Sequence, residues 1–517
     1  MKNGISSKTR NLIVAASLLA LFLGALDALI MSAAMPTIVA DLGAIHLYSW
    51  VYSTYFLARA ISLPIVGKLA DLYQNKTLFL ISTALFLLAS IAAGCSPNMP
   101  FLIAARIFQG IGAGGNFALV YIILSDVSSP EKRGKMLSLA SSIWGISSVL
   151  GPSLGGFIVS YFSWRWIFFI NVPIGLLSLA GIGFFLVELR PRKSEVHPDL
   201  NGAFLLSVGI MAFLMVFLTG GSHFAWLSPA ILALALVSLA AIFGFYLTEK
   251  RARDPILDFR FFRLKGFLIG NLAPFLSSFA IFSLFAYAPL FMQGGLGMNP
   301  MEVGAGMLTL SLGWSASALV LGQVIHRLQK RTSARIGSLF LLSGSGLTLF
   351  FSQSTTMTEC IVSFTLVGIG MGLVTLSTLL LVQESLDISD LGVATSSNQF
   401  ARTLGGAVGI GISGGVVTRA LTSGLDPGSR TGVLAGLPEE ILASLKQNIE
   451  TLFQPEVQSM LPAPARQALG QAVANGVSSV FWIVFLVSLL CVWLCFLIPK
   501  SGREQNTRLR DQVRQGN

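Results

Sequence analysis

Fourteen runs of about 20 apolar residues, separated by polar breaks, set the strongest limit on how this 517-residue chain can fold. A helical run of that length matches the hydrocarbon core of a membrane. Only 11% of the residues are charged and 54% are hydrophobic, which leaves too few charges to cover a soluble protein of this size. The sequence therefore predicts an all-α, polytopic membrane protein. The predicted spans are 12–33, 48–67, 77–95, 102–123, 136–160, 166–187, 200–220, 226–247, 267–292, 302–325, 335–352, 358–382, 392–418 and 477–498.

The basic residues indicate how the spans are oriented. Most of the 34 Lys and Arg residues fall in segments that share one side of the membrane with Lys2, Lys8 and Arg10. Because cytoplasmic loops are enriched in Lys and Arg, we expect both termini in the cytoplasm. The same loops account for the net charge of +11, so we expect no nucleic-acid partner.

An internal repeat relates the two ends of the chain. The segment 67–76 aligns with 322–331, and 110–114 aligns with 368–372. This repeat predicts two six-helix bundles related by a pseudo-twofold axis normal to the membrane, the architecture of a rocker-switch transporter with a central cavity. The expected units are an N-terminal bundle at 1–190, two inserted linker spans at 191–266, a C-terminal bundle at 267–498 with an outer loop at 419–476, and a basic cytoplasmic tail at 499–517.

Three motifs give the chain a family resemblance. They are Arg106-Ile-Phe-Gln109-Gly110, Gly151-Pro152-Ser-Leu-Gly155-Gly156, and Trp164-Arg165-Trp166 followed by Asn171-Val-Pro173. With these motifs the chain resembles the major facilitator superfamily and, within it, the fourteen-span drug:proton antiporter family. The resemblance implies export of small amphiphilic molecules or drugs across the plasma membrane, the inner membrane in a bacterium. It also implies that the proton gradient drives export, with no cofactor.

Asp27 is the only carboxylate well inside a predicted span. An ionised residue at the centre of a membrane helix costs about 2.5–3.5 kcal/mol, so it is a functional candidate. Counted along their helices, Asp27 and Arg106 lie at similar depths. We therefore expect Asp27 to alternate between a protonated state facing the cavity and an ionised state paired with Arg106, so that substrate and proton compete. The alternative is a permanent structural ion pair of Asp27 with Arg106 or Arg59.

Arg59 and Arg402 lie nearer the middle of their spans, and we expect them either to line the substrate cavity or to pair between helices. Because three arginines and one aspartate lie well inside the spans, we expect neutral or anionic amphiphiles to be preferred over quaternary cations. Large or polar residues within the spans complete the predicted cavity, and they are Asn116, Trp144, Phe279, Tyr287 and Gln399.

The resemblance also implies two gating elements. One is the loop after the second span, in which Gly67, Asp71 and Lys76 carry over from the family motif. There Asp71 is expected to pair with Arg133 or to cap a helix terminus in the other half. The other is the run Gly151, Pro152, Gly155 and Gly156, whose surface is expected to seal against proton leak, the alternative being a static kink.

Other functions fit the sequence less well. The resemblance implies that a symporter importing a small solute is disfavoured, because the Gly151-Pro152 element is similar to the motif that separates antiporters from symporters in the superfamily. A membrane-embedded enzyme or sensor is disfavoured by the lack of a nucleophile with its base. The strings Gly110-x-Gly112-x-x-Gly115 and Gly409-x-Gly411-x-x-Gly414 favour close helix packing over dinucleotide binding, and scattered Cys and His residues predict no metal site.

The expected partners are therefore the substrate, protons and membrane lipid, bound by a functional monomer. We expect the outer loop to form short surface helices at 438–446 and 464–470 that cap the vestibule. The alternative is that this loop docks a periplasmic adaptor protein, as some similar exporters do.

Overall fold

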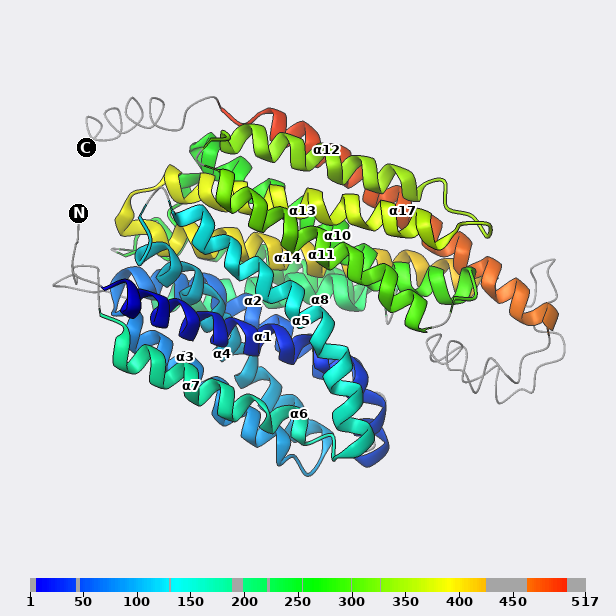
Figure 1. Cartoon of the computed structure of the whole chain (residues 1–517), viewed down its shortest axis with the longest axis horizontal. Coiled ribbons are helices and arrows are strands. Elements are labelled where there is room, and N and C mark those ends of the chain that lie inside the picture. Colours follow the sequence, from blue (N-terminus) through cyan, green and yellow to red (C-terminus); the bar gives the residue numbers. More distant parts are fainter. Residues whose placement is uncertain are drawn as a thin grey trace.

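A computed structural model shows a bundle of long, roughly parallel helices (Figure 1). The structure describes residues 6–42, 47–129, 132–187, 199–220, 224–252, 254–298, 300–325, 327–424 and 463–499. Within these ranges the β structure is limited to one isolated bridge between Gly220 and Phe224. The all-α prediction is confirmed for this part of the chain.

The helices follow the predicted runs from one end of the chain to the other. The first group is α1 (Ser7–Leu42), α2 (Tyr48–Leu72), α3 (Asn75–Gly94), α4 (Met99–Asp126), α5 (Arg133–Tyr161), α6 (Trp166–Phe169) and α7 (Asn171–Phe185). The middle of the chain forms α8 (Leu200–Thr219), α9 (Pro229–Glu249) and the short 3-10 helix η2 (Phe259–Arg263). The last group is α10 (Lys265–Leu290), the π-helical turn η3 (Phe291–Gly295), α11 (Pro300–Val324), α12 (Lys330–Thr348), α13 (Met357–Ser385), η4 (Ile388–Asp390), α14 (Leu391–Gly424) and α17 (Ala463–Phe496).

Eleven helices of the described residues are long and apolar enough to cross a membrane. The sixth of the predicted runs corresponds to α6 and α7 together. The three predicted runs that fall outside the eleven correspond to α2, α5 and α12. Of these, α12 is the most polar, because it begins with Lys330 and Arg331 and has Arg335 one turn later. These three still form helices of 25, 29 and 19 residues.

Local sequence signals explain where several helices begin. The Asn98 side chain accepts a hydrogen bond from Phe101 N at 2.9 Å and so caps α4, while Thr356 and Glu359 form a capping box at the start of α13. The outer loop differs from its prediction. Residues 464–470 belong to the first turns of α17 and are not a separate surface helix, whereas 438–446 lies outside the described residues.

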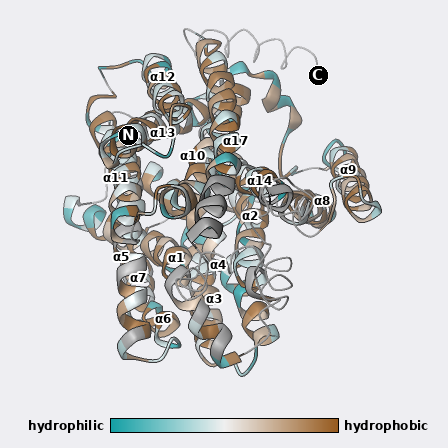
Figure 2. Ribbon diagram, turned by 90° about the vertical axis from the view of Figure 1, so that its right-hand side faces the viewer, coloured by the Kyte–Doolittle hydropathy of each residue, from teal (hydrophilic) through white to brown (hydrophobic). Residues whose placement is uncertain are grey.

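The helices form two bundles that correspond to the repeat (Figure 1). Helices α1–α7 form one half and α10–α17 the other, and the halves meet where α2 contacts α14 and α5 contacts α11. The inserted α8 packs against α2 and α14, and α9 lies at the periphery against α8 (Figure 2). The first turn of α1 and the last turn of α17 lie at the same end of the molecule (Figure 1).

Glycines allow the helices within each bundle to pack closely. A Cβ atom at Gly112 of α4 would lie 2.7 Å from the backbone nitrogen of Phe86 in α3. Gly409 of α14 would meet the carbonyl oxygen of Phe279 in α10 at 2.6 Å. Both glycine strings therefore lie where small residues let two helix backbones approach each other, as expected for packing motifs.

Candidate functional site

Asp27 and Arg106 form an ion pair that is buried inside the N-terminal half. Arg106 Nη1 on α4 donates a hydrogen bond to Asp27 Oδ2 on α1 at 2.5 Å, and each side chain is only 1% exposed. The pairing expected from their depths is therefore present. In this arrangement Asp27 faces the interior of its own half rather than the cavity described below.

Polar side chains from α3, α4 and α7 surround the ion pair. Gln109 Nε2 donates to the second carboxylate oxygen of Asp27 at 2.9 Å, and Asn171 Nδ2 donates to the same oxygen at 3.3 Å. Ser90 Oγ accepts hydrogen bonds from both amides and donates to the carbonyl oxygen of Phe168. The carboxylate thus has three donors in a region from which water is excluded, as a buried charge requires.

Sequence reasoning did not assign Gln109, Asn171 or Ser90 to this site. The motifs that carry the family resemblance contain Gln109 and Asn171, so a signal was present. What the sequence did not show is the rotation of each helix, which decides whether a polar side chain faces Asp27 or another neighbour.

Arg106 also contacts α2, the helix that reaches from the ion pair to the interface between the halves. Its guanidinium lies over the ring of Tyr55, with 4.0 Å from Cζ to the ring centroid, and Nε donates to the carbonyl oxygen of Val51. Arg59, one turn beyond Tyr55, lines the central cavity. A single helix therefore touches both the ion pair and the cavity.

A cavity of about 300 Å³ lies between the two halves. Its walls come from α1, α2, α4 and α5 on one side and from α8, α10, α11 and α14 on the other. The lining is mostly aromatic and aliphatic, as in binding sites for apolar ligands. Its residues are Ala28, Leu29, Tyr52, Ser53, Phe56, Leu57, Arg59, Ala60, Phe117, Trp144, Leu214, Phe282, Trp314, Arg402, Thr403, Gly406, Ala407 and Ile410.

Two arginines and two tryptophans stand out in this apolar wall. Arg59 Cζ lies 4.3 Å from the ring centroid of Phe117 and 5.3 Å from that of Trp144. The rings of Trp144 and Trp314 stack across the interface, with centroids 6.5 Å apart and an angle of 11° between their planes. Arg402 Cζ lies 5.4 Å from the ring centroid of Trp314. The arrangement joins the halves through cation–π and stacking contacts.

Three of the predicted cavity residues, Arg59, Trp144 and Arg402, line this cavity, and the others lie elsewhere. Asn116 accepts a hydrogen bond from Thr83 inside the N-terminal half, and Phe279 is buried against α14. Tyr287 donates through its hydroxyl to the carbonyl oxygen of Ile410. Gln399 is fully buried, and its Oε1 accepts a hydrogen bond from Arg402 Nη1 at 2.8 Å. It therefore positions a cavity residue without lining the cavity.

At the end of the molecule nearest the start of α14, Asp71 connects the two halves. Its carboxylate accepts hydrogen bonds from the backbone nitrogens of Gly392 and Val393, at 2.8 and 2.9 Å, in the first turn of α14. The contact with a helix terminus is the second of the two arrangements expected for Asp71. Gly67 and Gly392 bring α2 and α14 so close that a Cβ at Gly67 would overlap Ser396.

The remaining predicted gating residues occupy helix ends and one helix interior. Lys76 lies in the first turn of α3 and Arg133 is the first residue of α5, both half-buried. Gly151 packs α5 against α1, because a Cβ there would lie 2.8 Å from the Cβ of Leu29. Gly155 is buried, and Gly156 has no atom within 4 Å of its Cβ position among the described residues. Helix α5 continues through Pro152 without interruption.

Two pseudo-equivalent helix bundles with a cavity between them are the architecture of a membrane transporter. Residues 17–410 match the sequence profile of the Major Facilitator Superfamily. The chain belongs to this family, and it is a transporter and not an enzyme.

Relatives named as multidrug transport or resistance proteins and as efflux pumps align over nearly the whole chain. The multidrug transporter protein MdtP of Bacillus subtilis is 31% identical over 513 residues, covering 96% of this chain and 94% of that protein. Multidrug resistance protein 3 of the same organism is 30% identical over 486 residues, covering 93% of each chain. Efflux pump dotC of Dothistroma septosporum is 31% identical, with 93% of this chain and 82% of the pump aligned.

Solved structures share the fold at low sequence identity. The human organic anion transporter MFSD10 superposes with a TM-score of 0.61 at 15% identity, over 93% of this chain and 99% of that one. The proton:xylose symporter XylE superposes with a TM-score of 0.62 at 13% identity, over 96% of this chain and 97% of that one. These similarities establish the architecture alone.

Proposed function

We propose that this protein is a proton-coupled antiporter that exports small amphiphilic molecules across the plasma membrane by a rocker-switch motion. The observation that carries the proposal is a carboxylate, Asp27, held by ionic and amide donors at membrane depth beside a central apolar cavity. The names of its relatives, multidrug transporters and efflux pumps, support export rather than import.

The proposal includes fourteen membrane spans with both termini in the cytoplasm. The eleven long apolar helices support it, together with α2, α5 and α12, the helices that occupy the remaining predicted runs. Helix α2 faces the cavity and the ion pair. The excess of basic residues in the predicted inner loops supports the orientation.

Proton coupling would use the ion pair and α2. Protonation of Asp27 would remove the charge that holds the Arg106 guanidinium, so Arg106 would change its contacts with Val51 and Tyr55 on α2. Because Arg59 on the same helix lines the cavity, such a change would alter the substrate site. In this route substrate and proton do not compete directly for Asp27. Instead, α2 couples protonation of the ion pair to the substrate cavity.

The energetics suffice for export. One proton moving through a force of ~180 mV releases about 4 kcal/mol, which sustains a substrate gradient of roughly a thousandfold. The closed end would be held by Asp71 on the first turn of α14 and by the close approach at Gly67. Opening this end requires both contacts to separate.

The proposal is tested by reconstituting the full chain in liposomes with an imposed pH gradient and following neutral, anionic and cationic fluorescent amphiphiles. An antiporter moves substrate against the direction of proton flow, whereas a symporter moves both in the same direction. We expect antiport in the wild type and loss of gradient-driven movement in Asp27→Asn, with counterflow exchange retained. Undiminished gradient-driven antiport in Asp27→Asn would remove this carboxylate from the coupling role.

A further inference from the structure

The wall of the central cavity carries hydrogen-bond donors that have no acceptor. The Nε atoms of Arg59 and Arg402 and the indole Nε1 atoms of Trp144 and Trp314 are buried without a hydrogen-bond partner in the described part of the chain. The two arginines are only 5% and 9% exposed. A buried donor without an acceptor is destabilising. All four atoms are donors, so the group that would satisfy them is a hydrogen-bond acceptor.

The charges around the cavity have one sign. Its lining includes Arg59 and Arg402 and, among the described residues, no Asp or Glu. The nearby acidic side chain, Asp27, already binds Arg106 and two amides. Arg59 and Arg402 line the same cavity, and two positive charges within one apolar cavity repel each other. A ligand that carries a negative charge would remove this repulsion as well as satisfy the donors.

The internal repeat relates the four side chains in two pairs. In each pair, an arginine in one half corresponds to a tryptophan in the other half. Arg59 on α2 and Trp314 on α11 occupy equivalent places, because the carbonyl oxygen of each lies against a glycine of the repeated motif, Gly114 and Gly372. Trp144 on α5 follows Gly134 at the same spacing as Arg402 on α14 follows Gly392. Each half therefore contributes one guanidinium and one indole to the same cavity.

The shape of these groups selects among anions. Guanidinium groups bind planar oxyanions such as carboxylates through two parallel hydrogen bonds, and their faces stack on aromatic rings. The indole planes of Trp144 and Trp314 lie parallel to within 11°. Phe56, Phe117 and Phe282 supply an apolar surface for the remainder of a ligand. These features fit a flat aromatic body with one oxyanion.

We propose that Arg59, Arg402, Trp144 and Trp314 form an anion-binding site that selects aromatic amphiphiles carrying one carboxylate group. The inference rests on the proposed export function and names its substrate class. The anion accepts hydrogen bonds from a guanidinium of each half, so binding draws the two halves together around the ligand. Amphiphilic cations are rejected by the two uncompensated positive charges.

The first test uses the purified full chain in lipid nanodiscs and three probes with the same ring system. They are 2-naphthoate, its uncharged methyl ester, and 2-naphthyltrimethylammonium, each measured by equilibrium dialysis against empty nanodiscs. We expect 2-naphthoate to bind about tenfold or more tightly than the ester, and the cation most weakly, from the strength of charged hydrogen bonds. Equal affinities for the acid and the ester, or tighter binding of the cation, would overturn the proposal without any variant.

The second test uses Arg59→Gln and Arg402→Gln, with Arg260→Gln as the matched control. Arg260 has a side chain that is 64% exposed and lies on η2, outside the cavity lining. In each cavity variant the acid-to-ester affinity ratio should fall about tenfold, and Arg→Lys at either position should restore part of it. The control should keep the wild-type ratio. A ratio that survives both glutamine substitutions would place the anion elsewhere.

Transport in liposomes separates this inference from the proposed function. Gradient-driven antiport of all three probes at equal rates would support the antiporter and reject anion selection. Selective binding of 2-naphthoate that no pH gradient converts into transport would support the anion site and reject proton coupling. Selective, gradient-driven antiport of 2-naphthoate supports both.

Discussion

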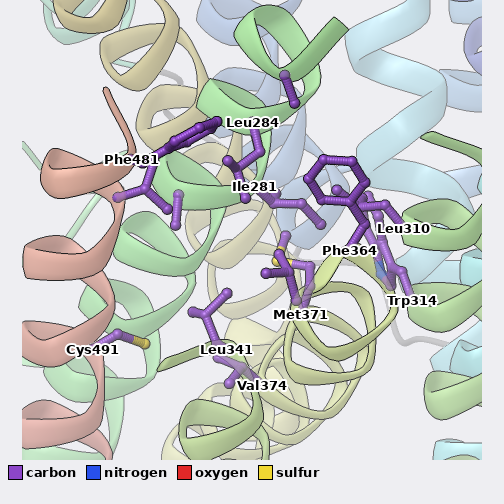
Figure 3. Packing of buried hydrophobic residues seen from close by; sticks show 14 of the residues in the cluster. Ile281, Leu284, Leu310, Trp314, Leu341, Phe364, Met371, Val374, Phe481 and Cys491 are labelled. Carbon is purple, nitrogen blue, oxygen red and sulfur yellow. The ribbon is translucent and has the colours of Figure 1, made fainter. Parts of the chain in front are cut away.

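The two halves of this transporter share the packing of their helices but have different interiors. In the N-terminal half Gly112 lets α4 approach Phe86 of α3, and in the C-terminal half Gly370 lets α13 approach Leu341 of α12 in the same way. At the centre, however, Arg106 is aligned with Phe364 and Gln109 with Val367. The C-terminal core is apolar there, with Phe364 and Met371 buried among aliphatic and aromatic neighbours (Figure 3).

This difference shows that the backbone framework and the buried charges can vary independently. Small residues that fix helix spacing are kept in both halves, whereas, among the described residues, a buried ion pair with amide partners is present only in the N-terminal half. An apolar core gives stability without a functional group, and a buried ion pair gives little net stability compared with apolar residues of similar size. The polar centre is thus explained by function better than by folding.

The largest effect is expected when the ion pair is broken on one side. Arg106→Met leaves Asp27 buried and unpaired, which should cost about 3–5 kcal/mol of stability. The double variant Asp27→Leu with Arg106→Met makes this centre resemble the C-terminal one, and most of that stability should return while gradient-driven transport stays lost. Thermal unfolding in detergent and transport in liposomes measure the two effects. Equal stability of the single and double variants would contradict this view of the pair. Phe364→Leu, at the aligned position of the C-terminal half, is the apolar control.

The shared framework predicts equal effects in both halves. Gly112→Ala and Gly370→Ala each place a methyl group against a backbone nitrogen of the neighbouring helix, which should destabilise the fold by about 1–3 kcal/mol. Gly304→Ala, where no atom lies within 4 Å of the Cβ position, is the control on an uncrowded helix surface and should change stability little. A large difference between the two crowded positions, measured by thermal unfolding, would show that the halves do not pack alike.

Exchange of the aligned residues Gln109 and Val367 sharpens the comparison of the two centres. Gln109→Val removes a donor to Asp27 and an acceptor for Arg106, and Val367→Gln buries an amide among apolar side chains. Each should cost about 1–3 kcal/mol. Only Gln109→Val should also change the dependence of transport on pH. A matching pH change in Val367→Gln would mean that proton coupling is not confined to the N-terminal half.

The contact between the halves should respond more weakly. Asp71→Asn keeps the size of the side chain but removes the charge at the start of α14, a loss of about 0.5–2 kcal/mol for the conformation in which this end is closed. Spin-label distances between α2 and α14 should show a larger open population. Asp258→Asn, on a carboxylate outside this contact, should leave the distances unchanged.

The smallest effect is expected at an exposed ion pair of the N-terminal half, Asp41 with Arg165. Asp41 accepts hydrogen bonds from Trp164 Nε1 at 2.9 Å and Arg165 Nη1 at 2.8 Å, and these donors hold the pKa of its carboxyl below the ordinary value of 3.8. Because the folded-state pKa is lowered, the stabilisation is present above pH 3.8 and is lost as the pH falls through the lowered value. The unfolding temperatures of wild type and Asp41→Asn should differ slightly at neutral pH and converge in strong acid. A difference that persists in strong acid would show a role beyond charge.

Much of this arrangement could be predicted because hydrophobicity and depth are readable from the sequence. The runs located the helices, and residue counts along them placed Asp27 level with Arg106. Depth does not give rotation about a helix axis, so Asn116 and Gln399 were expected in the cavity and instead face neighbours within their own halves. The tryptophan of the C-terminal half, Trp314, was missed although its alignment with Arg59 was available in the repeat.

The meeting of Gly67 with Gly392 leaves no room between α2 and α14 for even one additional carbon atom. Even the methyl group of an alanine at position 67 would push α2 and α14 apart at this contact. The transporter would then be open at this end for more of its cycle. A change of one methyl group, outside the cavity lining and the Asp27–Arg106 ion pair, would thus be enough to bias the side of the membrane to which the cavity opens.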